Sequence, residues 1–164
     1  MNARKLSQIG VALAVVLIGV FSGTTCCATP DFNLSEGGTV YVPVYSHIYV
    51  GIKGLAFDLA ISLIIRNTDP ARPITVSSVA YHDSAGKPVR QFLEKPVQIP
   101  PLASTDFFVS ESDTTGGFGA AFVVKWKSAT KMNAPIVEAV MAGTKAGQGI
   151  SFTTRGQAIE DRRQ

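Results

Sequence analysis

Residues 106–127 read Asp-Phe-Phe-Val-Ser-Glu-Ser-Asp-Thr-Thr-Gly-Gly-Phe-Gly-Ala-Ala-Phe-Val-Val-Lys-Trp-Lys. Two runs rich in β-branched and aromatic residues flank a polar, acidic loop whose glycines suit a turn. The stretch therefore predicts a strand, a loop and a second strand. Because the rest of the chain repeats this alternation of apolar runs and turn residues, it indicates an all-β fold.

Similar runs predict about eight short strands, over residues 39–50, 57–66, 74–81, 89–93, 105–109, 120–127, 136–141 and 150–154. No convincing helix follows the N-terminal segment. Short strands at regular spacing predict an immunoglobulin-like antiparallel β-sandwich of about seven to nine strands. Residues 57–66 are apolar on both faces, which predicts a central strand, and residues 96–104, with Ile-Pro-Pro, predict a crossing between sheets.

Residues 39–50 alternate almost strictly and should present two different faces. Valines on one face suit a core, while the other face carries an aromatic stripe of Tyr41, Tyr45, His47 and Tyr49. Pro43 cannot donate to a strand ladder, so this strand should lie at a sheet edge or carry a bulge.

The N-terminus has the three parts of an export signal. Arg4 and Lys5 precede an uncharged apolar run at residues 9–21, and small residues then lead to Ala28. We expect residues 1–28 to be a signal peptide, inserted as a helix and cleaved near Ala28. An uncleaved helical anchor is an alternative, because the uncharged stretch is just long enough to span a bilayer.

Cys26 and Cys27 are the only cysteines and lie at the end of this segment. A cysteine after an apolar run is the lipidation site of bacterial lipoproteins, which makes lipidation of Cys26 or Cys27 a further alternative. That pattern wants a small residue directly before the cysteine, whereas Thr25 precedes Cys26. The remaining chain has no cysteine, so it can form no disulfide and must be stabilised by its core.

The length of the chain predicts a single domain, which we expect to be exported. We expect a linker over residues 29–38, a sandwich over 39–155 and a charged, frayed C-terminal tail over 156–164. Without Arg4 and Lys5, 13 basic side chains of the original 15 face 12 acidic ones, a net charge of about +1. No basic patch supports nucleic-acid binding.

Two groups of residues are candidate ligand-binding sites. The aromatic stripe could stack on a glycan or a partner protein, although such rings often only pack beneath a loop. The loop over residues 110–117 carries Glu111 and Asp113, with hydroxyls that could contact a ligand or an ion. A polar connection between strands is the simpler interpretation of that loop.

The sequence offers little for catalysis. No nucleophile elbow, phosphate loop or paired carboxylates can be recognised. A zinc site needs three or four converging ligands, whereas His47 and His82 are the only histidines. We therefore expect no cofactor, no metal and no catalytic residue. A small hydrolase or metal-dependent enzyme using His47, His82 and nearby carboxylates remains the alternative.

Several motifs resemble a family of exported bacterial proteins known as domain of unknown function 3124. The resemblance rests on residues 39–49, 65–70, 111–113 with Gly116-Gly117, and 135–141. It implies a protein of the bacterial envelope, periplasmic or secreted, and it brings no activity. We expect a non-catalytic module that binds an envelope protein or a glycan, with a structural envelope subunit as a further alternative. The membrane would be contacted only through the N-terminal segment.

Overall fold

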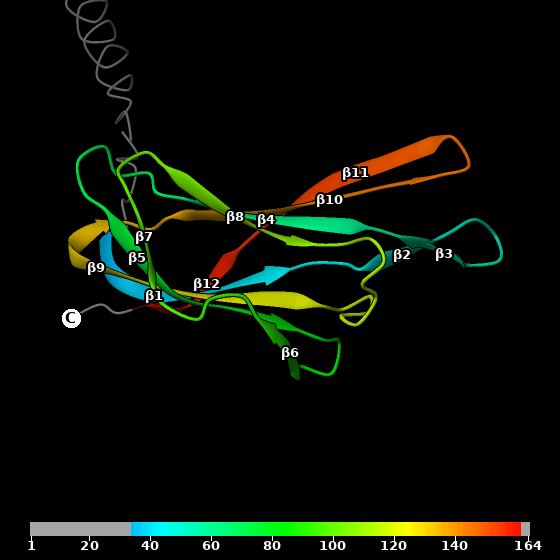
Figure 1. Cartoon of the computed structure of the whole chain (residues 1–164), viewed down its shortest axis with the longest axis horizontal. Helices are drawn as coiled ribbons and strands as arrows, with labels where there is room; N and C mark the ends of the chain where they lie inside the picture. The colour runs from blue at the N-terminus through cyan, green and yellow to red at the C-terminus, as the bar shows by residue number, and fades with distance from the viewer. Residues whose placement is uncertain (1–33, 162–164) are drawn as a thin grey trace, which may run out of the picture. The chain divides into compact units, whose positions relative to one another are not determined.

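A computed structural model describes residues 34–161, and every regular element in this range is a β-strand (Figure 1). The described residues belong to one compact unit, Phe32–Gln164. The expected signal segment, its helix, Cys26 and Cys27 lie outside that range. Within residues 34–161, no helix could cross a membrane. The strands are β1 Leu34–Pro43, β2 His47–Val50, β3 Leu55–Asp58, β4 Ala60–Arg66, β5 Ile74–His82, β6 Pro88–Gln91, β7 Val97–Ile99, β8 Ser104–Val109, β9 Ala121–Asn133, β10 Ile136–Lys145, β11 Gln148–Arg155 and β12 Gln157–Asp161.

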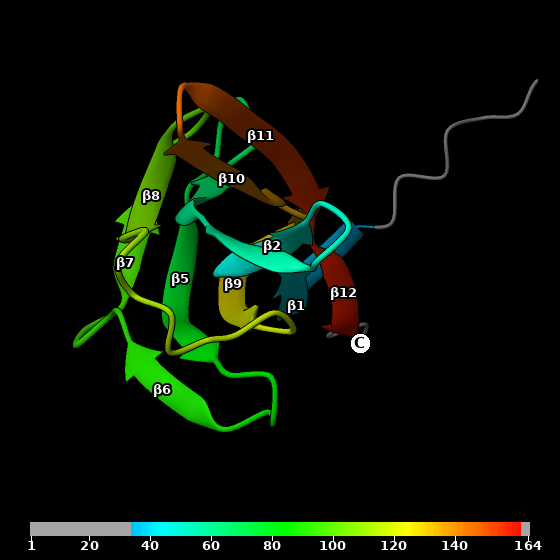
Figure 2. The same cartoon turned by 90° about the vertical axis from the view of Figure 1, so that its right-hand side faces the viewer.

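The strands form two larger sheets and one small hairpin, all antiparallel (Figure 2). One sheet has the order β12-β1-β9-β5-β6, with β7 also pairing with β5, and the other has the order β11-β10-β4-β8. Strands β2 and β3 pair only with each other in the described structure. The expectation of an all-β, antiparallel fold is confirmed, and the immunoglobulin-like assignment stays a prediction.

Period-two alternation places the core as the sequence indicates. Val40, Val42 and Val44 of the first strand region are buried, and β4 buries Ile61, Leu63 and Ile65 completely. Each such side chain contributes about 1.5–3 kcal/mol when fully buried. Strand β4 lies between β10 and β8, so the predicted central position is confirmed.

Within residues 34–161, five connections lead directly from one larger sheet to the other, namely β4–β5, β7–β8, β8–β9, β9–β10 and β11–β12. Residues 100–103 join β7, which pairs with β5, to β8, which pairs with β4, so the predicted crossing at the Ile-Pro-Pro segment is confirmed. Gly156 forms another of these crossings, between β11 and β12. Its N–H donates to Val137 O at 2.8 Å, and a Cβ there would lie 2.6 Å from Val40 Cγ1. The close approach explains why a glycine occupies the crossing.

Two of the expected strands are each divided. Residues 39–50 leave the first sheet after Pro43 and continue as β2, and residues 57–66 divide at Leu59 into β3 and β4. Strand β1 is not at the sheet edge, because it sits between β12 and β9, but it carries the register shifts of a bulged strand, at Ser35/Gly37 and Thr39/Val40, which was the other half of the prediction. Pro43 lies outside both shifts. It is tolerated because it is the last residue of β1, beyond the final pair with β12 at Tyr41 and Gln157.

The ends of the domain extend further than the sequence pattern indicates. Strand β1 begins at Leu34, within the expected linker, and β12 occupies most of the expected frayed tail. Thr39 Oγ1 donates to Glu160 Oε2 at 2.8 Å across this pair. Residues 157–161 of the expected tail thus form a sheet strand, and residues 162–164 lie outside the described range. The weak apolar alternation of β12 fits a strand at the outer edge of the sheet.

Candidate functional site

The β2–β3 hairpin and the loop between β8 and β9 meet at one end of the domain. Ser46, which is fully buried, joins them through Gly117 O, which accepts bonds from its N–H at 3.2 Å and its hydroxyl at 3.1 Å. Ser46 O in turn accepts from Leu59 N–H at 2.9 Å. One small residue therefore fixes three segments that are distant in the sequence.

This junction gathers four rings into what we call the aromatic site: Tyr45, His47, Tyr49 and Phe118. The Phe118 ring centroid lies 5.3 Å from Tyr45, 6.3 Å from His47 and 5.7 Å from Tyr49. The Tyr49 and Phe118 rings are stacked at 30°, and these side chains stay 60% and 47% exposed. Phe152 of β11 supports Tyr45 from the core side at 5.8 Å. The site therefore presents a supported aromatic surface to solvent.

A short chain of hydrogen bonds orients the polar part of the aromatic site. The Ser46 hydroxyl donates to Gly117 O, so its oxygen is left to accept, and in the tautomer that matches this arrangement His47 Nδ1–H donates to Ser46 Oγ at 3.2 Å. His47 Nε2 then accepts from the Tyr49 hydroxyl at 3.3 Å. This arrangement gives a tyrosine and a histidine with fixed orientations at the rim of a stacking surface.

The Ser46–His47 pair does not have the geometry of an activated nucleophile. Ser46 is completely buried and its hydroxyl is committed to a backbone carbonyl. The second nitrogen of His47 meets Tyr49 rather than a carboxylate. Among residues 34–161, no three His, Cys, Asp or Glu side chains gather at a possible metal site. His82 lies on β5 with its Nδ1 buried and unpartnered within the described structure.

The structure separates the other sequence candidates from the aromatic site. Tyr41 pairs with Val123 of β9 and with Gln157 of β12, and it is exposed on the first sheet. Asp113 forms an ion pair with Arg90 of β6 at 2.5 Å. The hydroxyl of Thr115, followed by Arg90, holds the pKa of Asp113 below its usual value. Asp113 therefore fastens the loop.

Glu111 lies elsewhere, where it lines an open groove of about 530 Å³ beside the β10–β11 hairpin. The rest of this groove is lined by small residues and one isoleucine, namely Ala142, Gly143, Thr144, Gly149, Ile150 and Ser151. The six sequence candidates thus fall into several places. Three of them converge in the aromatic site, and all six remain candidates.

Phe118 and the buried residues that place it could not be recognised from the sequence pattern as parts of the site. Phe118 follows Gly117, whose φ of +75° suits glycine. A Cβ on the neighbouring Gly116 would overlap the Tyr81 hydroxyl. That hydroxyl is fully buried without a hydrogen-bond partner among the described residues, and burial raises the pKa of Tyr81 to about 12. The glycine pair was a visible signal of a turn, but not of which rings it brings together.

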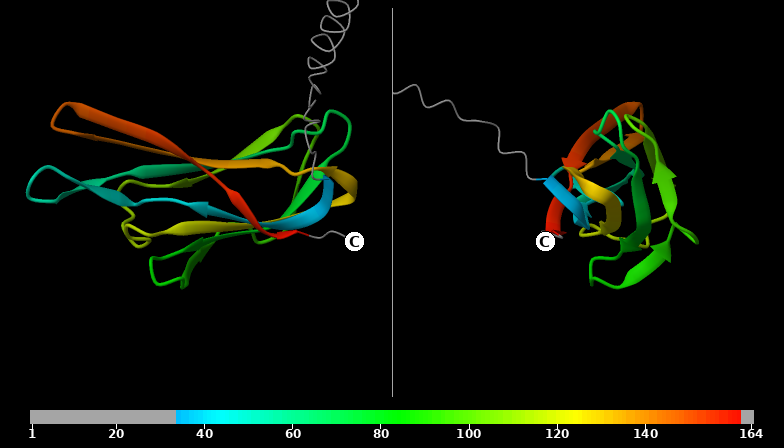
Figure 3. Two further views of the ribbon diagram at one scale, coloured as in Figure 1. Left: turned by 180° about the vertical axis from the view of Figure 1, so that it is seen from behind. Right: turned by 90° about the vertical axis from the view of Figure 1, so that its left-hand side faces the viewer.

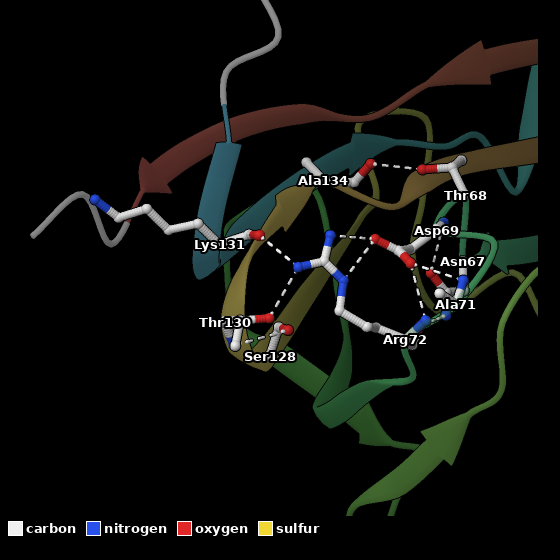
Figure 4. A network of polar contacts seen from close by, with 9 residues as sticks. All are labelled: Asn67, Thr68, Asp69, Ala71, Arg72, Ser128, Thr130, Lys131 and Ala134. Atoms are coloured by element: carbon white, nitrogen blue, oxygen red, sulfur yellow. Dashed lines mark hydrogen bonds and ion pairs between the residues drawn. The ribbon is translucent and has the colours of Figure 1, made fainter.

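The opposite end of the domain carries a polar network that closes the β4–β5 loop (Figure 4). Asp69 accepts from Arg72 Nε at 3.0 Å and from Nη2 at 2.7 Å, and this pairing lowers the pKa of Asp69. Arg72 Nη1 donates to Thr130 Oγ1 and to Lys131 O, both at 3.0 Å. Arg72 thereby ties the loop to the end of β9. We therefore assign these hydrogen bonds a role in stabilising the fold.

With this geometry in view, the comparisons identify the family. Residues 37–159 match the family described as "Protein of unknown function (DUF3124)". The chain belongs to this family. The match runs from β1 into β12 and so includes every strand that builds the aromatic site.

Other comparisons add little. No curated protein sequence matches the chain. A solved structure from Thermotoga maritima, titled "Crystal Structure of Thermotoga maritima 1070", is similar at 17% identity and a TM-score of 0.45. The likeness covers 76% of this chain and 96% of that chain. At that level it carries neither fold nor function over to this protein.

Proposed function

We propose that this protein is an exported, non-catalytic binding module of the bacterial envelope, with an immunoglobulin-like sandwich that presents the aromatic site to a glycan. The observation that carries the proposal is the stacked, exposed pair of Tyr49 and Phe118, held by a rigid support. The described residues of this site bring aromatic rings together, and they bring together neither an activated nucleophile nor a set of metal ligands. We therefore favour binding over catalysis, and we argue it from the site rather than from the fold.

A glycan suits this surface for a chemical reason. The C–H faces of a sugar pack against aromatic faces, while its hydroxyls need donors and acceptors at the rim. Tyr49 supplies a face and a hydroxyl, Phe118 supplies a second face, and the His47 ring lies beside both. Ser46 and Phe152 hold these rings in place, which lowers the entropic cost of binding.

The test is calorimetric titration of the protein with soluble peptidoglycan fragments. Tyr49→Ala and Phe118→Ala should each weaken binding by about tenfold, since each removes one stacking face. Phe108→Ala is the matched control, because Phe108 is 57% exposed on β8 and contacts no ring of the aromatic site in the described structure. Tyr41→Ala should also leave the affinity unchanged.

The glycan proposal would be wrong if wild-type protein bound none of these fragments, or if Tyr41→Ala weakened binding while the aromatic-site variants did not. The hydrolase alternative gains nothing from the buried Ser46. The structural-subunit alternative requires an exposed edge strand around Pro43. There β1 pairs with β9 alone, because its pairing with β12 ends at Tyr41, and Pro43 O accepts from Thr154 Oγ1 of β11 at 2.6 Å.

Export is a separate part of the proposal. We propose that residues 1–28 direct the chain out of the cytoplasm and are cleaved near Ala28, with lipidation at Cys26 or Cys27 as the alternative. The intact mass of protein isolated from its native envelope tests this. A cleaved, unmodified mass supports a periplasmic or secreted module. A diacylglycerol mass lost in Cys26→Ser, Cys27→Ser supports a lipoprotein, and an uncleaved mass contradicts the cleavage.

A further inference from the structure

The β2–β3 hairpin carries apolar side chains at its tip, beyond any packing partner. Its turn is closed by a bond from Gly54 N–H to Gly51 O at 3.2 Å, and both glycines have positive φ. Between them stand Ile52, which extends fully into solvent, and Lys53. Leu55, directly after the turn, is 62% exposed. Ile52 therefore contributes no burial to the fold, and Leu55 is buried only in its smaller part.

Two other hairpins of this protein turn without exposing large aliphatic side chains at their tips. Figure 3 shows the β2–β3 and β10–β11 hairpins extending at the same end of the domain. The β10–β11 tip reads Thr144-Lys-Ala-Gly-Gln148, and the β5–β6 tip reads Asp83-Ser-Ala-Gly-Lys87. Both are polar or small, as exposed turns usually are. The β2–β3 tip alone among these three offers a β-branched aliphatic side chain to solvent.

Charge around the tip has one sign. The exposed residues 51–56 carry a single charge, Lys53, and no carboxylate. A second cation lies close by, because Lys145 Nζ donates to Ala56 O at 2.8 Å. Tyr49, on the strand that leads to the turn, adds an exposed ring with a polar end. An amphipathic ring, aliphatic groups and lysines are the composition that sits at an anionic lipid–water interface.

We propose that the β2–β3 tip inserts into the surface of an anionic lipid bilayer, with Ile52 and Leu55 entering the headgroup region and Lys53 contacting lipid phosphates. The shape of the tip favours a bilayer as its partner. The turn projects and its isoleucine is fully exposed, and a fluid bilayer can surround such a side chain with apolar groups on every side. The lysines complement its negative charge. This proposal does not depend on glycan binding at the aromatic site.

The experiment uses the full chain with a fluorescent reporter at the hairpin tip. A local reporter is needed because the N-terminal segment could itself bind lipid, so binding of the whole chain would not show that the tip inserts. The native Trp126 is buried, so an added tryptophan in Ile52→Trp reports its own surroundings. Vesicles of phosphatidylglycerol and phosphatidylethanolamine should shift its emission to the blue, and nitroxide-labelled lipids should quench it. Vesicles of phosphatidylcholine alone should do so much less, because the lysines then lack anionic partners.

Matched variants separate insertion from simple proximity to the membrane. Phe108→Trp, at an exposed position on β8, should be neither shifted nor quenched. In the Ile52→Trp background, Lys53→Glu should weaken the response on anionic vesicles by at least about fivefold, the contribution of one lysine, and Leu55→Asp by about tenfold. Quenching that is equal at positions 52 and 108, or absent at position 52 on anionic vesicles, would overturn the proposal. Neither result would bear on glycan binding, which calorimetry measures without lipid.

Discussion

Gly116 stands where no larger residue fits, because the Tyr81 hydroxyl lies directly beneath it. A Cβ at Gly116 would also come within 2.7 Å of Ala120 Cβ. We predict that Gly116→Ala lowers the free energy of unfolding by about 2 kcal/mol through overpacking. Urea denaturation followed by circular dichroism measures the change.

Two comparisons decide whether Tyr81 is the cause. Tyr81→Phe removes a buried, unpartnered hydroxyl and should be neutral or stabilising by about 1 kcal/mol. The double variant should recover part of the loss caused by Gly116→Ala. Gly149→Ala is the control, because its Cβ would meet only Thr144 Cγ2 at 3.9 Å. Equal losses in the single and double variants would contradict this explanation.

The same hydroxyl gives the fold a dependence on alkaline pH. Burial, aided by the negative charge of Asp113, raises the pKa of Tyr81 from 10.0 to about 12. Between these values the unfolded chain loses the phenol proton while the folded chain keeps it, so the stability present below pH 10 declines as pH rises. The free energy of unfolding should fall by up to about 2.7 kcal/mol from this residue. In titrations with urea, Tyr81→Phe should show a smaller fall, and identical slopes would refute the assignment.

At the scale of elements, the bend at Ser46 joins the hairpin to the loop between β8 and β9. Ser46→Ala removes the bond from the hydroxyl to Gly117 O and the contact with His47. We predict a loss of about 1 kcal/mol in unfolding free energy. Amide hydrogen exchange at Gly117–Gly119 should accelerate, and glycan affinity should fall although no ring is altered.

Ser110→Ala provides the control for this prediction. Ser110 lies in the same loop, but it is exposed and its hydroxyl contacts Ser112. Its exchange protection at Gly117–Gly119 and its glycan affinity should match the wild type. Unchanged exchange in Ser46→Ala would show that the loop is held by its other bonds, through Ser84 and Arg90.

Most strands could be predicted because a half-buried strand repeats every two residues, and that repeat is local. The valines of β1 and the aliphatic residues of β4 reveal their faces in this way. The divisions after Pro43 and at Leu59 could not be predicted, because alternation continues through them. The hydrogen bond from Leu59 N–H to Ser46 O connects the two places where the chain divides into separate strands. It joins positions that are distant in the sequence, so local alternation does not reveal it.

The aromatic site shows the same limit. Tyr45, His47 and Tyr49 share a local stripe and could be proposed from the sequence. Phe118 belongs to the site only because the loop is tied to Ser46. Tyr41 shares the stripe in sequence but stays with the first sheet, because the chain bends after Pro43.

For the whole molecule, β12 closes the first sheet along β1. Ending the chain after Gly156 would remove this strand and the bond between Thr39 and Glu160. We predict a loss of about 2 kcal/mol or more in unfolding free energy, together with aggregation through the exposed β1 edge. Thermal denaturation and light scattering measure both effects. A chain ending at Asp161 keeps β12 and should behave as the wild type, and equal stability of the two would contradict a structural role for β12.

Glycan binding at the aromatic site can be located residue by residue with nitrogen-15 NMR of the whole domain during titration with soluble peptidoglycan fragments. We predict amide shifts that saturate with ligand and are centred on residues 45–49 and on Gly117 and Phe118. Tyr49 and Gly117 are 68 residues apart in the sequence, and their segments come together at the aromatic site. Shifts centred on Tyr41 and the outer face of the first sheet, or no shifts at saturating ligand, would contradict glycan binding at this site.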